Sequence, residues 1–249
     1  MTLNGNTMQK LLMLLAVLLC MSCVQRDEMS DLAEGRLELS IGQISLSTET
    51  RAIPSVLGKP LVDEFALQIQ RSGTAVTEYK GKFKESIGVP AATYDITATC
   101  GEDVIIGRDA PFYIGTAQAQ VEIGQTKSVN ISCHVGNALV SVMFGRDDAE
   151  RQAFDEMYDD YGLLVKIGQH SMAITKETAA TSIYFQAGSS PELIFYGTLK
   201  DGRVVSTVVS HQSIPKVFQA GNHAIVRLSL SGSDWIIIEG GESFGGEFQ

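Results

Sequence analysis

Two cysteine thiols, Cys100 and Cys133, are the side chains in this sequence with the clearest chemical potential. Alternate residues of a strand share a face, and each cysteine belongs to an alternating apolar pattern, in YDITATC and in VNISCHV. Both thiols are therefore expected to point into one core. Outside the cytosol they could form a disulfide worth about 3–4 kcal/mol, or they could stay free as small hydrophobes. The sequence leaves both interpretations open because it gives no Cα distance.

Other nucleophiles and ligands lack the neighbours that catalysis or metal binding needs. The segment GESFG, residues 241–245, matches the G-x-S-x-G nucleophile elbow, but no histidine follows it to act as a base. None of the four histidines is spaced i, i+4 from another, and no H-E-x-x-H motif occurs. His134, beside Cys133, offers too few ligands for zinc. We therefore expect a protein that is not an enzyme and that carries no metal and no cofactor.

A third thiol, Cys23, follows a short apolar segment, Leu11–Leu19, which a lysine precedes. This segment is too short to span a bilayer, which takes about 20 residues, and it has the length of a signal-peptide core. Ser22 and Cys23 resemble the lipobox of bacterial lipoproteins, in which the cysteine is acylated and the chain is cut ahead of it. We predict a lipoprotein signal peptide at 1–22, lipidation of Cys23 and a polar tether at 23–34.

The residues after Cys23 indicate a destination. The stretch CVQRDE places Asp27 and Glu28 directly behind the lipidated position. It resembles an acidic export signal that routes lipoproteins to the cell surface in one phylum of Gram-negative bacteria. A charged linker without a targeting role is the alternative. The resemblance implies an outer-membrane protein that is lipid-anchored and faces the cell exterior.

The charged residues of the sequence bear on the choice of partner and on the interpretation of one acidic segment. The net charge of −10 argues against nucleic acid, because phosphate binding needs a basic face. In DDAERQAFDEMYDDYG, apolar residues recur at helical spacing, which predicts a short helix over 148–159. The acids there come in pairs with Arg151 among them, unlike the alternating ligands of a calcium loop. We interpret them as a solvated face.

The rest of the chain is predicted to form strands. Short alternating segments run from RLELSI to HAIVRLSL, separated by turn signals such as Asp201–Gly202. Such strands without intervening amphipathic helices are typical of sandwiches and barrels. We predict an all-β fold of two consecutive antiparallel β-sandwich domains, 35–135 and 136–240, before a flexible Gly-rich tail at 241–249. The segments PAATYDITAT and QAGNHAIVRL suggest that the two domains are related.

Several segments resemble one protein family. They are GRLELSI, TRA, PAATYDITATCGED, DAPFYIG, SVNISCHVGNALVSVMF, DDYGLLVKIG and ELIFYGTLKDG. On these segments the chain is identified as a member of the domain of unknown function family 4493, found in outer-membrane lipoproteins. That family is similar to fimbrillin-like and transthyretin-like β-sandwich lipoproteins, some of which assemble pili or mediate adhesion. The resemblance implies a fold and no catalytic residue.

Two functional hypotheses follow. The first is a non-enzymatic surface lipoprotein, held in the membrane by its acyl anchor, that acts in cell adhesion or fimbria assembly with pilin-like partners. An open sandwich edge could accept a strand from such a partner. The alternative is a lipoprotein that binds carbohydrate or another host ligand, which predicts an exposed cluster of rings. The candidate rings are Tyr158, Tyr161, Tyr184, Phe195 and Trp235.

Arg51, in TETRA, is a candidate processing site. Some fimbrial subunits mature by trypsin-like cleavage after an arginine, and Arg51 could be such a site. An ordinary loop arginine before Pro54 is the simpler interpretation for so short a motif.

Overall fold

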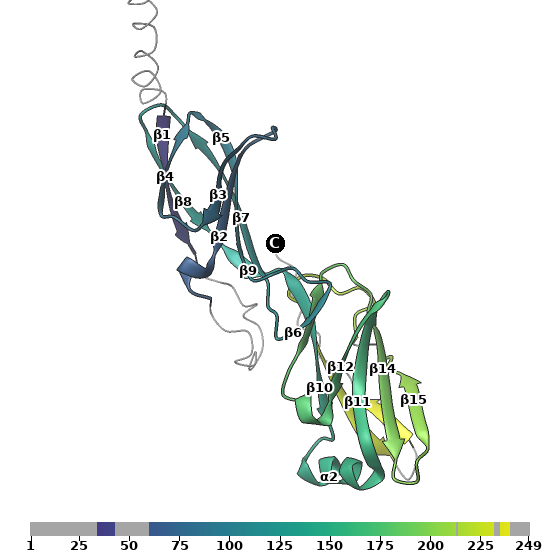
Figure 1. The fold of residues 1–249 in the computed structure, drawn as a ribbon. Helices are drawn as coiled ribbons and strands as arrows, with labels where there is room; N and C mark the ends of the chain where they lie inside the picture. The colour runs from purple at the N-terminus through teal and green to yellow at the C-terminus, as the bar shows by residue number, and fades with distance from the viewer. Residues whose placement is uncertain (1–33, 43–59, 213, 232–234, 240–249) are drawn as a thin grey trace, which may run out of the picture.

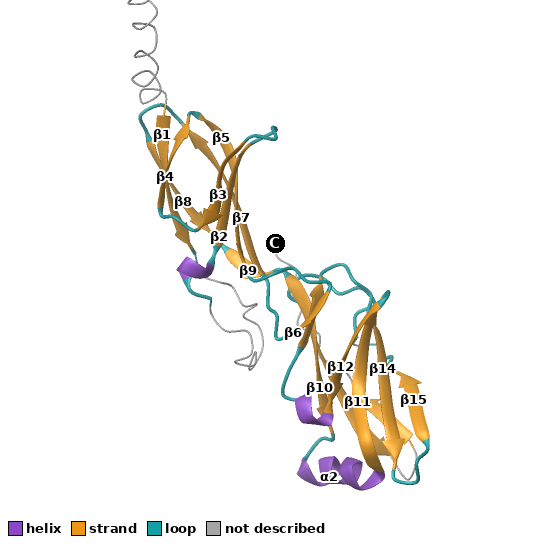
Figure 2. Ribbon diagram, viewed as in Figure 1, coloured by secondary structure: helices purple, strands orange, loops and turns teal. Residues whose placement is uncertain are grey.

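The computed structural model describes residues 34–42, 60–212, 214–231 and 235–239. Over these residues the chain forms two β-sandwiches that follow one another in an elongated molecule (Figure 1). Strands dominate both sandwiches (Figure 2). The predicted all-β class with two consecutive sandwiches is confirmed. Among the described residues, no helix has the length and apolar character needed to cross a membrane.

The first sandwich packs a three-stranded sheet against a five-stranded one. In the smaller sheet, β1 (Glu34–Ile41) lies between β4 (Ser86–Pro90), which is antiparallel to it, and β8 (Thr126–Ile131), which is parallel. The larger sheet is antiparallel, in the order β3-β2-β5-β7-β9. Its strands are β2 (Ala66–Arg71), β3 (Thr77–Lys82), β5 (Ala92–Cys100), β7 (Tyr113–Val121) and β9 (Cys133–Val135). The short 3-10 helix η3 (Val62–Glu64) precedes β2.

The second sandwich packs a sheet of order β17-β16-β10-β13-β6 against one of order β12-β11-β14-β15. The first of these sheets consists of β6 (Ile106–Arg108), β10 (Asn137–Phe144), β13 (Ile183–Gln186), β16 (His223–Ser231) and β17 (Trp235–Glu239). The second consists of β11 (Tyr158–Ile167), β12 (His170–Thr175), β14 (Glu192–Leu199) and β15 (Val204–Val208). The helices are α2 (Asp148–Met157) and the short η4 (Lys176–Thr178).

Both sandwiches have the same strand topology. In each, the first strand (β1 or β10) lies between an antiparallel strand (β4 or β13) and a late parallel strand (β8 or β16). The facing sheets, β3-β2-β5-β7 and β12-β11-β14-β15, also correspond. This correspondence pairs β5 with β14 and β16 with β8. The segments PAATYDITAT, in β5, and QAGNHAIVRL, in β16, are therefore not equivalent, although the two sandwiches share one topology.

Each sandwich has an apolar core of its own, built from the inward faces of its strands. In the first core β1 contributes Leu37 and Leu39, and β5 contributes Tyr94, Ile96 and Ala98. The alternate residues of these strands are exposed or half-buried, as period-2 patterning requires.

The alternation in VNISCHV continues through a change of sheet. The segment was expected to be one strand, but β8 ends at Ile131 in one sheet and β9 begins at Cys133 in the facing sheet. Gly115 of β7 lies beside this crossing. A Cβ on Gly115 would lie 2.6 Å from both the carbonyl oxygen of Ser132 and the Sγ of Cys133. Only glycine lets the chain cross between the layers at this point.

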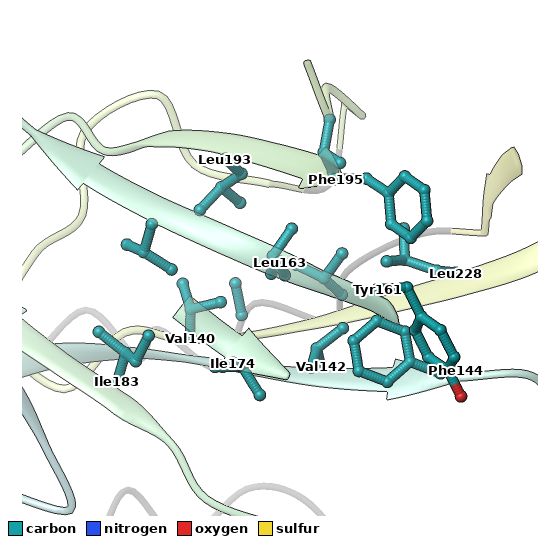
Figure 3. Close-up of a cluster of buried hydrophobic side chains, with 14 of the residues drawn as sticks. Val140, Val142, Phe144, Tyr161, Leu163, Ile174, Ile183, Leu193, Phe195 and Leu228 are labelled. Atoms are coloured by element: carbon teal, nitrogen blue, oxygen red, sulfur yellow. The ribbon is translucent and has the colours of Figure 1, made fainter. Parts of the chain in front are cut away.

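The second core includes a group of aromatic rings, among them Phe144, Tyr161 and Phe195 (Figure 3). Phe154 is the buried residue of α2, and Asp147 caps the helix by accepting a hydrogen bond from the backbone N–H of Glu150. The predicted helix is therefore present. It ends at Met157 instead of Asp159, because β11 begins at Tyr158.

Candidate functional site

A short strand from the first sandwich enters the second sandwich. β6 lies between β5 and β7 in the sequence, yet it pairs antiparallel with β13. Arg108, its last residue, donates from Nη1 to the Oγ1 of Thr181 at 2.7 Å and from Nη2 to the carbonyl oxygen of Ala173 at 2.6 Å. Ala173 belongs to β12, so the arginine also connects the two sheets. The predicted limits of the domains, with a division near 135, stay a prediction, and residues 106–108 pair beyond that division.

Polar side chains also fix the segment that follows β6, residues 109–112, to the second sandwich. Asn137, at the start of β10, is fully buried. Its Nδ2 donates to the carbonyl oxygen of Ala110 at 2.9 Å, and its Oδ1 accepts from the backbone N–H of Phe112 at 3.2 Å. Asp109 adopts a positive φ of 46°, which aspartate tolerates better than most residues. The Oδ1 of Asp109 accepts from the backbone N–H of Ser182 at 3.1 Å.

These contacts bury part of the sheet that contains β10, β13 and β16, on the face turned away from the second core. We call this part of the sheet the joint face. It consists of Asn137, Leu139, Ser141, Tyr184 and His223, on three neighbouring strands. Leu139 is in register with both Tyr184 and His223, so the side chains share a face. Leu139 and Tyr184 pack into the first core, whereas Val140 and Val142 point into the second. The two sandwiches are therefore joined by buried side chains as well as by β6.

The joint face contains the contact that most resembles a catalytic pair. The Oγ of Ser141 lies 2.9 Å from the Nε2 of His223 and 2.7 Å from the Oγ of Ser182. A hydroxyl bonded to an imidazole is the first contact of a nucleophile–base pair. Here Ser182 and His223 are almost completely buried, and burial lowers the pKa of His223 to about 4. We interpret this neutral, buried imidazole as a structural group whose hydrogen bond helps to hold β10, β13 and β16 together.

Tyr184 provides a test of the joint face. Its ring is fully buried, and its hydroxyl has no hydrogen-bond partner among the described residues. Burying an unpaired hydroxyl is costly, so Tyr184→Phe should raise the free energy of unfolding by about 1 kcal/mol. Urea denaturation measures this difference. Tyr94→Phe is the matched control, because the Tyr94 hydroxyl donates to the carbonyl oxygen of Pro90 at 2.6 Å and its loss should be destabilising. A loss of stability in both variants would mean that Tyr184 does have a partner.

The two core cysteines lie on neighbouring positions of one sheet. Cys100 is in register with Tyr113 of β7, and Cys133 is in register with Gly115, two residues further along β7. Both belong to or pack against the first core, as predicted, and both are free thiols in this structure. Burial, with a smaller contribution from Cys100, raises the pKa of Cys133 to about 11. Cys133 is thus a protonated, weak nucleophile at neutral pH, and the disulfide stays a prediction.

The ring cluster expected for carbohydrate binding is not exposed. Four of the five rings are buried, namely Tyr158, Tyr161, Tyr184 and Phe195. Tyr158 contacts both Tyr161 and Phe195 through tilted or edge-to-face ring pairs, and Tyr184 is part of the joint face. None of the four rings offers a surface to a sugar. This expectation was wrong because Tyr158, Tyr161 and Phe195 pack into the second core and Tyr184 packs into the first core. Trp235 begins β17, and its side chain lies outside the described residues.

The acidic segment around α2 is balanced by nearby bases. Its carboxylates form ion pairs, some of them with basic side chains of other elements. These pairs are Arg146–Glu150, Arg151–Asp148, Lys176–Asp155 and Lys200–Asp159. Across the described part of the chain, no group of three or more candidate ligands could hold a metal ion. The predictions for Cys23, Arg51 and the segment GESFG fall outside the described residues.

Two tandem β-sandwiches of one topology, connected by the pairing of β6 with β13, define the fold of this chain, and solved structures share it. A candidate cell adhesion protein of Bacteroides uniformis is similar to it, with 11% identity, a TM-score of 0.52, and 84% of this chain and 96% of that chain covered. A fimbrial assembly protein of Parabacteroides distasonis is also similar, with 9% identity, a TM-score of 0.48, and 83% and 98% covered. At these identities the likeness concerns the fold alone.

The family model for the Domain of unknown function DUF4493 matches residues 33–239. The chain therefore belongs to this family, and the resemblance seen in the sequence is confirmed. A comparison with curated protein sequences found no match.

Proposed function

We propose that this protein is a non-enzymatic surface lipoprotein of the outer membrane that acts in cell adhesion or fimbria assembly. Acylation of Cys23 anchors the chain, residues 23–34 form a tether, and the two sandwiches extend from the cell. Pilin-like subunits are the expected partners, because sheet edges can accept a further strand through backbone hydrogen bonds alone.

The observation that carries this proposal is the joint between the sandwiches. An adhesive subunit must hold its outer module away from the membrane and transmit force along its length. A strand of one sandwich paired into the sheet of the other, with Asn137 and Arg108 fixing its flanks, suits that task better than a flexible linker. The candidate active contact, Ser141 with His223, lies in this joint, where His223 is almost completely buried, so we assign it a structural role.

Protease shaving of intact cells tests the proposal. Cells that make the unaltered chain should lose both sandwiches to an external protease, whereas a periplasmic control protein survives. Cys23→Ala removes the acylated thiol and should release the chain from the membrane fraction. Ser22→Ala is the matched control, since it keeps a small residue before the cysteine. Full protection of the unaltered chain in intact cells would overturn the surface location.

A further inference from the structure

One sheet edge of the second sandwich has no feature that prevents another strand from pairing with it. β15 is the terminal strand of its sheet and, among the described strands, hydrogen-bonds to β14 alone. It lies at the outer margin of the second sandwich (Figure 1). Its sequence is VVSTV, without charge, proline or glycine. Val204 is 76% exposed and Val208 58% exposed. Natural proteins usually protect such edges.

Other edges of this molecule do carry that protection. β3, at the edge of the five-stranded sheet of the first sandwich, contains Glu78, Lys80 and Lys82. β4 contains Gly88 and ends at Pro90, which has no N–H to offer. β12, at the other edge of the β15 sheet, lies against β6, where Arg108 binds the carbonyl oxygen of Ala173. A bare, β-branched edge at β15 therefore contrasts with these protected ones.

The hydrogen bonds to β14 fix which backbone groups of β15 face outward. Leu199 N–H donates to the carbonyl oxygen of Arg203, and Val209 N–H donates to that of Leu193, both at 2.8 Å. Bonded residues alternate along an antiparallel strand, so residues 203, 205, 207 and 209 bond to β14. The N–H and C=O groups of Val204, Ser206 and Val208 consequently point away from the sheet.

We propose that β15 pairs antiparallel with β15 of a second copy of this chain, about a two-fold axis at Ser206. In this register Val204 of each copy lies opposite Val208 of the other, and Ser206 lies opposite its own counterpart. All outward N–H and C=O groups then form reciprocal hydrogen bonds. The two four-stranded sheets become one continuous sheet.

The occupant is a second copy because the strand is complementary to itself. The register places valine against valine and serine against serine on the outer face, and Val205 against Thr207 on the other. The two exposed valines of each copy, Val204 and Val208, then lie beside the valines of the other copy. The net charge of −10 makes copies repel one another generally, and an uncharged strand offers the approach with the least repulsion. A two-fold contact also closes, so it yields a dimer and no open filament.

The pairing sets the orientation of the two copies. The strands of this sheet run roughly along the length of the molecule (Figure 1), and a two-fold axis perpendicular to the sheet reverses their direction. The first sandwiches of the two copies therefore lie at opposite ends of the dimer. If the chain is anchored at its N-terminus, which rests on the proposed function, the dimer joins copies on two facing membranes.

Cysteine cross-linking of the full chain in detergent tests the register. Paired residues of an antiparallel ladder have Cα atoms about 5.5 Å apart, within disulfide range. Val204→Cys mixed with Val208→Cys should give a disulfide-linked dimer that neither variant gives alone, and Ser206→Cys alone should give one. The unaltered chain controls for the native cysteines. Val76→Cys controls for random collision, because Val76 is 47% exposed and lies in a loop of the first sandwich. Equal yields from Val76→Cys, or cross-links to a different envelope protein, would overturn the pairing.

Sedimentation of the same protein tests whether the edge drives association. Ser206→Pro removes an outward N–H and leaves the bonds to β14 intact, so it should weaken the dimer about tenfold or more while the melting temperature holds. Val208→Lys should do the same by placing a charge against a valine. A chain that stays monomeric, or a dimer unaffected by both changes, would overturn the proposal.

Mixed cells separate this inference from the proposed function. One strain carries Val204→Cys and a second carries Val208→Cys, so a disulfide between them requires contact between cells. Dimers in detergent without this disulfide would overturn the facing-membrane arrangement alone. Shaved, surface-located chains that never dimerise would overturn the β15 pairing and leave the proposed location standing.

Discussion

Phe154→Ala is expected to lower the free energy of unfolding by about 3–5 kcal/mol. Phe154 is fully buried and is the side chain through which α2 enters the second core. Its ring centroid lies 5.3 Å from that of Tyr161, 6.0 Å from Tyr158 and 6.1 Å from Phe144. Removing it leaves a cavity among rings held by the strands, which cannot collapse to fill the space.

Urea denaturation followed by circular dichroism measures this loss. Gln152→Ala in the same helix is the matched control: its amide donates to Glu156 in an exposed pair, and the change should alter stability by no more than about 0.5 kcal/mol. A loss below about 1 kcal/mol for Phe154→Ala would mean that α2 does not depend on this ring.

The alternation of apolar and polar residues predicted the strands and their inward faces well, because this pattern is set by residues that are close together in the sequence. Leu37 and Leu39 in RLELSI are buried as expected, and Asp201–Gly202 forms the predicted turn, with Gly202 at a φ of 85°. The same rule could have corrected the ring hypothesis. Tyr161 alternates with Leu163 and Val165, and all three are buried.

The joint could not be predicted, because its partners are distant in the sequence and have no pattern of their own. β6 is three residues long, and its partner strand β13 follows about 75 residues later. Ser141 and His223 are 82 residues apart. The two side chains meet only because β10 and β16 lie side by side as a parallel pair, and no local sequence signal specifies that pairing.

His223 should make the fold lose stability as the pH falls from 6.5 to 4. Burial lowers the pKa of His223 from its ordinary 6.5 to about 4. In that window the unfolded chain binds a proton on this side chain and the folded chain does not, so protonation favours unfolding. The difference amounts to roughly 3 kcal/mol, nearly all of it present above pH 6.5 and lost at pH 4.

His223→Gln removes this titration and keeps a polar side chain beside Ser141. The variant should be less stable than the unaltered chain at pH 7, because the 2.9 Å contact with the Ser141 Oγ is disturbed, and its stability should change less between pH 6.5 and 4. His170→Gln, at an exposed position of β12, should leave the pH profile as it was. Parallel profiles for the unaltered chain and His223→Gln would show that acid sensitivity arises elsewhere. The result matters for the joint, since charging His223 would place a cation where the two sandwiches meet, and acid would loosen the molecule at that point first.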